Sequence, residues 1–339
     1  MNDAKGRMLA KSADHCVRRM GAYLATDVGM KRFGLGNAMQ LGRLYNRVRY
    51  RRRWNSHLEA CRGRLPGLLQ ENGGDLTFPP KLRMKDGWVL DSSHSLPHLD
   101  RLIEETGEII RECGGRKHSD IQYPFLRSLL FPGDLKKYPA FLDFVTSTEL
   151  LATVIDYLGT IPVLSKVRPP GVRFMESNVK LDPDSHLPPR DSQLYHIDFY
   201  DSPQVYVLVL AEDVTPECGP WTFLPASTTD RVAKELGYRE RGHGYRVQDA
   251  DVYQHVDKSA EIVFAYPKGT VLFIDSSRCF HFGSRNAVKP RFMVMYGLQS
   301  PCRRDFAYAY MPHEDFPIPK GASRLRSMLL GTIDDSLPS

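Results

Sequence analysis

Histidine and aspartate two positions apart are the residues in this sequence that most suggest metal chemistry. Four His-x-Asp triplets are compared as candidate metal ligands, those that begin at His98, His118, His196 and His313. With 11 histidines in 339 residues, about one such triplet is expected by chance. The triplet alone is therefore weak evidence for a metal site. The secondary structure expected around each of the four decides which of them can bind an ion.

Residues i and i+2 point to the same side only in an extended segment, whereas on a helix they lie far apart around the axis. His98 falls in a predicted helix, and His118 falls in a loop rich in Gly and Lys. His313 lies in a Pro-containing tail with no later histidine. His196 and Asp198 lie in LYHIDFY, a β-prone run that directs both side chains to one face and Tyr195 and Ile197 to the other.

A third metal ligand is predicted far along the chain, where the strand GTVLFID ends and His281 follows. Two imidazoles and one carboxylate form the facial triad that binds Fe(II) and leaves three coordination positions open. Arg291 follows ten residues after His281, as the first residue of the predicted strand RFMVMYGL. Its guanidinium matches a carboxylate in bidentate fashion, which suits the distal end of a dicarboxylate such as 2-oxoglutarate.

The elements that carry these residues are predicted to be mainly β with flanking helices. Helical patterns cover 97–113 and 138–159, with Ser95 as the expected cap of the first and Gly159 as the end of the second. From about residue 163, short β-rich runs alternate with turn residues, which is typical of a barrel or sandwich. A polar segment over 230–258, with His243, Tyr245 and His255, interrupts them and is expected to form a lid on the substrate side or an insertion.

Residues 1–66 carry 15 Lys and Arg against 4 Asp and Glu, although the whole chain has a net charge of only +6. They are predicted to form a basic helical extension that ends at Pro66 and Gly67. Three interpretations stay open for it: contact with an anionic membrane surface, nucleic-acid binding, or packing of its apolar side on the barrel. Packing is favoured, and nucleic acid is not expected as a partner.

Other features of the sequence argue against a membrane-spanning, a secreted or a disulfide-linked protein. No apolar run is long enough to cross a membrane, and the N-terminus lacks a secretory signal, so a cytoplasmic protein, peripheral to a membrane at most, is expected. The six cysteines are scattered without a CxxC pair, which predicts free thiols. The domain organisation expected is an extension over 1–66, an oxygenase domain over 82–305 and an irregular tail over 306–339.

The stretch from about 82 to 300 resembles the phytanoyl-CoA dioxygenase family of Fe(II)/2-oxoglutarate oxygenases. The segments that carry the resemblance are DGWVLDSSHSLPHLDRLIEET, DVTPECGPWTFLPAS and GTVLFIDSSRCFHFGSRN. The resemblance implies a double-stranded β-helix (a jelly roll, cupin-like), with His196, Asp198 and His281 as iron ligands and Arg291 as the anchor of the cosubstrate. Because Asp198 is retained, the expected reaction is hydroxylation of a C–H bond with O₂, releasing succinate and CO₂, on a small-molecule or lipid-like substrate.

Three further side chains are candidates for the cosubstrate site: Asn178 and Lys180, which precede the triad segment, and Trp221 on a later strand. Two other functions stay open. Ile197 and Leu208 differ from the residues common in the family. One alternative is therefore a jelly-roll binding protein that has lost catalytic activity. A cupin-type metalloenzyme that does not use 2-oxoglutarate is the other. The sequence identifies neither the substrate nor the oligomeric state.

Overall fold

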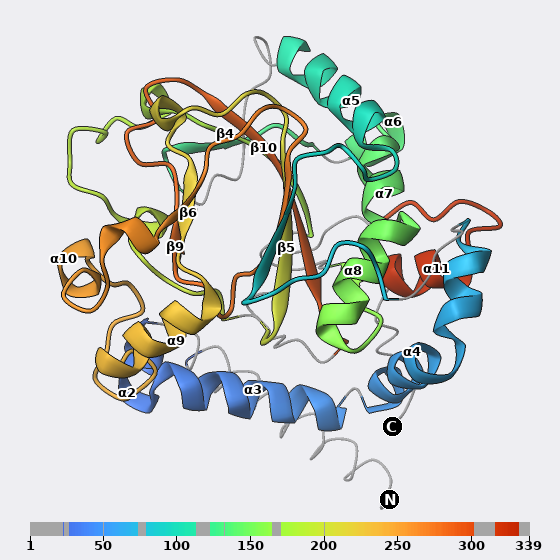
Figure 1. Cartoon of the computed structure of the whole chain (residues 1–339), viewed down its shortest axis with the longest axis horizontal. Coiled ribbons are helices and arrows are strands. Elements are labelled where there is room, and N and C mark those ends of the chain that lie inside the picture. Colours follow the sequence, from blue (N-terminus) through green and yellow to red (C-terminus); the bar gives the residue numbers. More distant parts are fainter. Residues whose placement is uncertain are drawn as a thin grey trace, which may run out of the picture.

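The computed structural model describes residues 23, 27–49, 51–73, 79–112, 123–131, 133–164, 171–199, 201–301 and 316–331. Within these ranges, two antiparallel β-sheets face each other, and helices cover the outer face of the larger one (Figure 1). The mainly β fold with flanking helices that the sequence predicts is confirmed.

The larger sheet has the strand order β1-β8-β5-β10-β4-β2. Its strands are β1 (Trp88–Asp91), β8 (Val271–Asp275), β5 (Gln204–Leu210), β10 (Arg291–Gln299), β4 (Val172–Ser177) and β2 (Leu126–Ser128), with β3 (Val163–Leu164) paired to β10. The smaller sheet has the order β7-β6-β9, made of β7 (Ile262–Phe264), β6 (Trp221–Phe223) and β9 (His281–Phe282). A backbone bridge between His196 and His281 adds the segment before β5 to this sheet.

From β4 onward the chain passes back and forth between the two sheets, with β6 and β7 as consecutive strands of the smaller one. β4, β5, β8 and β10 lie in the larger sheet, and the His196 segment, β6, β7 and β9 lie in the smaller one. This winding of antiparallel strands through two facing sheets is that of a jelly roll, so the predicted double-stranded β-helix is confirmed by the strand order itself.

Side-chain alternation along the central strand β5 explains why it is buried on both faces. Val205, Val207 and Val209 belong to the core under the helices, whereas Tyr206 and Leu208 belong to the core between the sheets. Successive residues of a strand point to opposite faces, so a run of apolar residues fills both cores at once.

Helices pack on the outer face of the larger sheet. They are α4 (Arg51–Glu71), α5 (Leu99–Glu112), α6 (Asp134–Lys137), α7 (Ala140–Val145), α8 (Thr148–Leu158) and α11 (Arg324–Leu330). Leu99, Phe141 and Leu150 from three of them share one hydrophobic core with the strands. The expected helix over 97–113 is α5. The expected helix over 138–159 is present as α7 and α8, and Gly159 ends it in a left-handed conformation as predicted.

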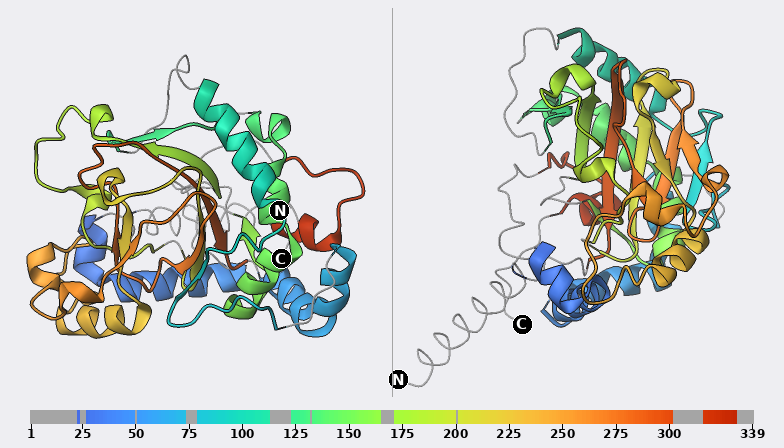
Figure 2. Two further views of the ribbon diagram at one scale, coloured as in Figure 1. Left: turned by 45° about the horizontal axis from the view of Figure 1, so that its top comes forward. Right: turned by 90° about the vertical axis from the view of Figure 1, so that its left-hand side faces the viewer.

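Two helices from the basic N-terminal region lie along one end of the barrel in every view (Figures 1 and 2). They are α2 (Asp27–Phe33) and α3 (Leu35–Arg49). Met30 and Leu35 pack in a cluster with Tyr195, Ile197 and Val232, the last of which belongs to α9 (Ala226–Glu235). The expected break at Pro66 is wrong, because α4 continues through Pro66 to Glu71. No helix among the described residues has the length and apolar character needed to cross a bilayer.

Burial of His57 on α4 makes the stability of the fold depend on pH. The imidazole Nδ1 lies 2.9 Å from the Ile161 carbonyl oxygen, and burial lowers the pKa of His57 to about 4. Between pH 6.5 and 4 the unfolded chain therefore binds a proton that the folded chain does not, so the free energy of unfolding falls as the pH falls through this window. We expect His57 to contribute about 2–3 kcal/mol of this loss between pH 7 and 4.5.

The test is chemical denaturation of the wild type and of His57→Gln across that pH range. Glutamine retains a donor for the Ile161 carbonyl oxygen but does not titrate, so the difference between the two unfolding free energies should change with pH by the stated amount. The matched control is His186→Gln, at an exposed position. A pH profile of His57→Gln that runs parallel to that of the wild type would show that His57 is not responsible.

Candidate metal centre

Two histidines and one aspartate converge between the sheets. The ligand atoms that His196, Asp198 and His281 can offer all lie within 4.8 Å of one another, and all three residues are buried. The two imidazole rings are 4.4 Å apart between centroids, and His281 Nε2 lies 3.7 Å from Asp198 Oδ2. The structure thus brings together the three residues that the sequence selected.

Backbone hydrogen bonds hold all three residues in place. The amide of His196 donates to the His281 carbonyl oxygen at 3.1 Å, and the amide of His281 donates to the His196 carbonyl oxygen at 3.0 Å. The Asp198 amide donates to the Ser276 carbonyl oxygen at 2.8 Å. The predicted strand around His196 is reduced to isolated bridges, but Tyr195 and Ile197 point to the opposite side, into a hydrophobic cluster, as expected.

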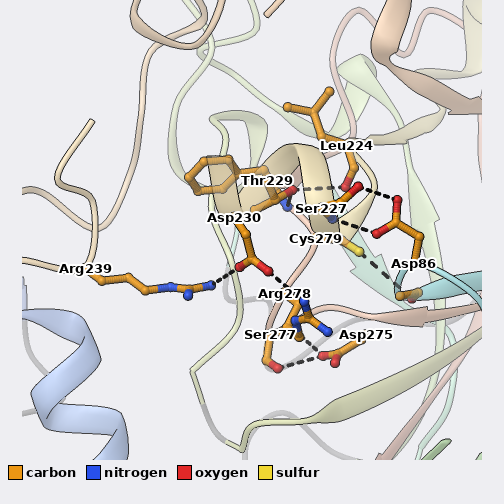
Figure 3. Close-up of polar contacts among 12 residues, drawn as sticks. Asp86, Leu224, Ser227, Thr229, Asp230, Arg239, Asp275, Ser277, Arg278 and Cys279 are labelled. Atoms are coloured by element: carbon orange, nitrogen blue, oxygen red, sulfur yellow. Dashed lines mark hydrogen bonds and ion pairs between the residues drawn. The ribbon is translucent and has the colours of Figure 1, made fainter. Parts of the chain in front are cut away.

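The turn between β8 and His281 is fixed by side-chain hydrogen bonds (Figure 3). Asp275 accepts from the Ser277 amide at 3.0 Å and from the Ser277 hydroxyl at 2.6 Å. Arg278 donates to Asp230 on α9 at 2.6 Å. These bonds hold the first half of the turn that leads to His281.

The donor atoms of the three residues fit a divalent metal ion. His196 Nδ1 lies 2.8 Å from the Leu194 carbonyl oxygen, and His281 Nδ1 lies 2.9 Å from the Cys279 carbonyl oxygen. A ring nitrogen that donates to a carbonyl leaves Nε2 with a lone pair, which is how metal-binding histidines are usually oriented. Asp198 Oδ2 is buried and has no hydrogen-bond partner among the described residues. Two imidazoles and a carboxylate are the ligand set of non-haem Fe(II) sites.

The electrostatic surroundings keep both imidazoles neutral. Burial lowers the pKa of His196 well below its ordinary value, and the neighbouring His281 and Arg246 add to the effect. Burial also lowers the pKa of His281, although the Asp198 carboxylate opposes it. Neutral imidazole is the form that binds a metal, so neither ligand has to lose a proton at neutral pH.

The three residues open into a cavity of about 110 Å³, which is room for several water-sized groups. Its wall combines aromatic, thioether and hydroxyl side chains: Tyr123, Tyr206, Trp221, Tyr245, Met175, Met293, Met295, Ser192 and Ser284. Asp198 is the one carboxylate among the described residues of this wall. Such a mixture of apolar surface with a few polar groups is typical of small-molecule sites.

Arg291 supplies a buried positive charge to the same cavity. It is the first residue of β10, as predicted, and only 4% of its surface is exposed. Its Nη1 donates to the Gly219 carbonyl oxygen at 2.5 Å and its Nη2 to the Ser284 hydroxyl at 3.0 Å, whereas Nε has no partner among the described residues. Burial lowers the pKa of Arg291 to about 10, so it stays charged at pH 7.

Gly219 holds the carbonyl oxygen that Arg291 contacts, in a conformation that other residues rarely adopt. Its φ is +59°, and an added Cβ would lie 2.6 Å from the Arg285 carbonyl oxygen. We expect Gly219→Ala to lower the free energy of unfolding by about 2–3 kcal/mol through strain and this contact. The control is Gly133→Ala, which has φ +86° but no atom within 4 Å of the added Cβ, so it reports the cost of the conformation alone. Equal losses of stability in the two variants, measured by chemical denaturation, would contradict the role of the contact.

Of the three additional candidates, the cavity includes only Trp221. Trp221 lies edge-on to the His281 ring, with 4.6 Å between centroids. Asn178 and Lys180 are not among the residues that line the cavity, and their role as cosubstrate ligands stays a prediction. The 3₁₀ helix η2 (Val179–Leu181) follows β4 directly, so the Asn178 side chain accepts from the Lys180 amide instead, and Lys180 is exposed.

The segment 230–258 contributes one side chain to the wall. Tyr245 packs against His196, with ring centroids 5.7 Å apart. His243 packs on Tyr238, and His255 pairs with Glu235 at 3.0 Å, so neither reaches the cavity.

The other His-x-Asp triplets do not form a metal site among the described residues. His98 and Asp100 are both exposed at the start of α5. The pairs that begin at His118 and His313 lie outside the described residues.

Two arginines of the site were missed by sequence reasoning. Arg173 on β4 lines the cavity, and Arg246 donates to the hydroxyl of the cavity residue Tyr123 at 3.1 Å. Alternation along β4 gave a usable signal for Arg173, since Val172 and Phe174 face the core and Arg173 must face the other side. Nothing in the local sequence marks Arg246, which reaches the site through an irregular loop.

Comparison with models of known families and with curated proteins finds no match. Solved structures do match in part. The non-haem α-ketoglutarate-dependent epimerase SnoN from nogalamycin biosynthesis is 14% identical, over 70% of this chain and 80% of that one, with a TM-score of 0.39. HygX from Streptomyces hygroscopicus with nickel and 2-oxoglutarate is 14% identical, over 63% and 82%, with a TM-score of 0.39. EctD from S. alaskensis in its apoform is 12% identical, over 76% and 90%, with a TM-score of 0.44. These identities and TM-scores are too low to support an argument about this chain. The description of its fold and site is therefore based on its own strand order and residues.

Proposed function

We propose that this chain is an Fe(II)- and 2-oxoglutarate-dependent oxygenase that hydroxylates a C–H bond of a small-molecule or lipid-like substrate. The observation that carries the proposal is one cavity that joins two kinds of site. It holds two neutral imidazoles with a carboxylate, and it also holds a buried arginine that forms no ion pair with any described residue. The resemblance of residues 82–300 to the phytanoyl-CoA dioxygenase family agrees with this proposal.

Each residue has a defined task in it. His196, Asp198 and His281 would hold Fe(II), which with 2-oxoglutarate and O₂ supplies the oxidation that turns a substrate C–H into C–OH and releases succinate and CO₂. Arg291 binds the distal carboxylate of the cosubstrate through its planar fork, because its charge has no carboxylate partner among the described residues.

The surrounding side chains orient the ligands and limit access of water. The carbonyl oxygens of Leu194 and Cys279 fix the imidazole rings, and Trp221 and Tyr245 pack against the two rings from the cavity side. Ile197, which differs from the family pattern, is buried in the cluster behind the site and does not line the cavity. Its identity therefore does not argue against turnover.

Succinate formation from 2-oxoglutarate, with and without Fe(II) and O₂, tests the proposal. We expect succinate to form only with both, and its rate to rise when a screened compound is a substrate. Binding of Fe(II) and 2-oxoglutarate without any succinate would instead identify a binding protein that has lost turnover. Iron-dependent oxidation without 2-oxoglutarate binding would identify a cupin-type metalloenzyme of another class.

Contact of residues 1–66 with an anionic membrane stays a prediction. The described part of this region offers one feature that suits it: Leu41, Leu44 and Val48 on α3 are all more than half exposed, and Arg47 lies beside them. An exposed apolar stripe with basic neighbours is the pattern of helices that lie on membranes. Co-sedimentation with vesicles that contain phosphatidylserine tests it, with neutral vesicles as the control.

A further inference from the structure

A second arginine faces the cavity without an anionic partner. Arg173 is the second residue of β4, and its guanidinium carbon lies 5.8 Å from the centroid of the Tyr206 ring. Nη2 lies against the Met295 sulfur, and Nε is buried with no hydrogen-bond partner among the described residues. A thioether is a weak acceptor, and an aromatic ring does not neutralise a full charge. The charge of Arg173 therefore has no anionic partner among the described residues.

Arg246 adds another positive charge behind the same wall. Its Nη2 donates to the Tyr123 hydroxyl, its guanidinium stacks on Tyr245 at 4.9 Å, and Nη1 is buried without a partner in the described part of the chain. Both Tyr123 and Tyr245 line the cavity. Neither Arg173 nor Arg246 forms an ion pair with a described carboxylate.

Positive charge remains at the site after the charges of Fe(II), 2-oxoglutarate and their protein ligands are added together. Fe(II), a 2-oxoglutarate dianion, Asp198 and Arg291 together sum to zero. Arg173 then remains as an unpaired positive charge at the cavity wall, where such a charge is costly, and Arg246 lies behind it within reach of the charge of Asp191. An anionic group on the primary substrate would remove this cost.

Arg173 and Arg291 are attached to the cavity wall at different positions along the paired strands β4 and β10. Arg173 pairs with Met295, which lies four residues from Arg291 along β10, so the two Cα atoms are about 13 Å apart along the strand. Each guanidinium also stays near its own end, Arg291 at Gly219 and Ser284, and Arg173 at Tyr206 and Met295. The cavity therefore has two separate positions for anions.

We propose that the primary substrate is anionic, and that Arg173, supported by Arg246, binds its carboxylate or phosphate group. This inference rests on the proposed function, because it takes Arg291 as the partner of 2-oxoglutarate. A planar guanidinium with a buried, unpartnered Nε favours an oxyanion that accepts two hydrogen bonds over a neutral substrate.

The test is isothermal titration of inorganic phosphate and of acetate, in separate experiments, into protein loaded with Fe(II) and 2-oxoglutarate without O₂. We expect at least one anion to bind the wild type, and Arg173→Met to weaken it about tenfold or more. Methionine suits the site because Met175, Met293 and Met295 already line it. The matched control is Arg64→Met, at an exposed position on α4, which should change the affinity less than twofold. If neither anion binds the wild type, or if Arg173→Met binds as the wild type does, the inference is wrong.

Two further measurements separate the possible failures. Arg173→Met should retain 2-oxoglutarate affinity within about threefold, and a loss as large as that of Arg291→Met would make Arg173 a cosubstrate ligand and overturn the inference. If the wild type does not bind 2-oxoglutarate, the proposed function is wrong. The dependence of anion binding on Arg173 can still be measured in that case, in the protein loaded with iron alone. If Arg173→Met does not fold, Arg173→Lys and Arg246→Met replace it, and unchanged anion affinity in both would contradict the proposal.

Discussion

His196→Ala is expected to abolish succinate formation and to weaken Fe(II) binding at least about a hundredfold. Loss of a residue that merely orients a metal ligand costs about 10–100-fold in affinity, and loss of the ligand itself should cost more. The expected reduction in turnover is about a thousandfold or greater, because the chemistry depends on the ion. Metal content after dialysis and succinate release measure the two effects separately.

The fold of this variant should be retained, which makes the result interpretable. His196 is held by backbone hydrogen bonds to His281, and these do not involve its side chain. The melting temperature of metal-free His196→Ala should therefore lie close to that of the metal-free wild type. His186→Ala, at an exposed position, is the control and should bind iron normally. Turnover at the wild-type rate in His196→Ala would exclude this residue as a ligand.

Arg291→Met is expected to weaken 2-oxoglutarate binding about thirtyfold or more while Fe(II) affinity changes little. Truncating one partner of a buried, hydrogen-bonded charge pair costs about 2–5 kcal/mol, part of which is the penalty for the carboxylate left unpaired. The metal ligands do not contact the Arg291 guanidinium, whose hydrogen bonds go to Gly219 and Ser284. Titration of 2-oxoglutarate and of Fe(II) into the same preparation measures both affinities.

The matched control for Arg291 is Lys289→Met. Lys289 lies two residues earlier in the chain and pairs with Glu217 at the surface, so this variant removes a nearby positive charge outside the cavity. Cosubstrate affinity should be unchanged in it. Unchanged affinity in Arg291→Met as well would favour a metalloenzyme that does not use 2-oxoglutarate.

Much of the fold was predictable because its strands carry a strong local signal. The β-rich runs GTVLFID and RFMVMYGL contain the strands β8 and β10, since apolar β-prone residues between turn residues leave few alternatives. The helix over 138–159 was predicted as one element but is two. Thr146 after α7 bonds the Leu142 carbonyl oxygen through its hydroxyl, and Ser147 is extended before α8. Such competition between side chain and backbone is hard to see in a sequence.

The placement of the predicted site residues follows from the sequence where backbone geometry decides it, and differs from the expectation where tertiary packing decides it. His196 and Asp198 were selected because an extended segment places both on one face, and the structure retains that geometry even without a regular strand. Asn178 was expected at the cosubstrate, but β4 ends at Ser177 and a tight turn takes its side chain. Arg246 could not be found at all, because its approach depends on how the loop after α9 folds over the barrel.

The mutual backbone hydrogen bonds of His196 and His281 have a consequence for how the protein acquires its ion. The distance between the two imidazoles is set by a pair of N–H···O bonds that would be present before any ion arrives. The site is therefore preorganised, and binding of the metal ion should cause little change in the circular dichroism spectrum and a modest rise in melting temperature. A protein stripped by a chelator should stay folded and regain its ion simply by mixing.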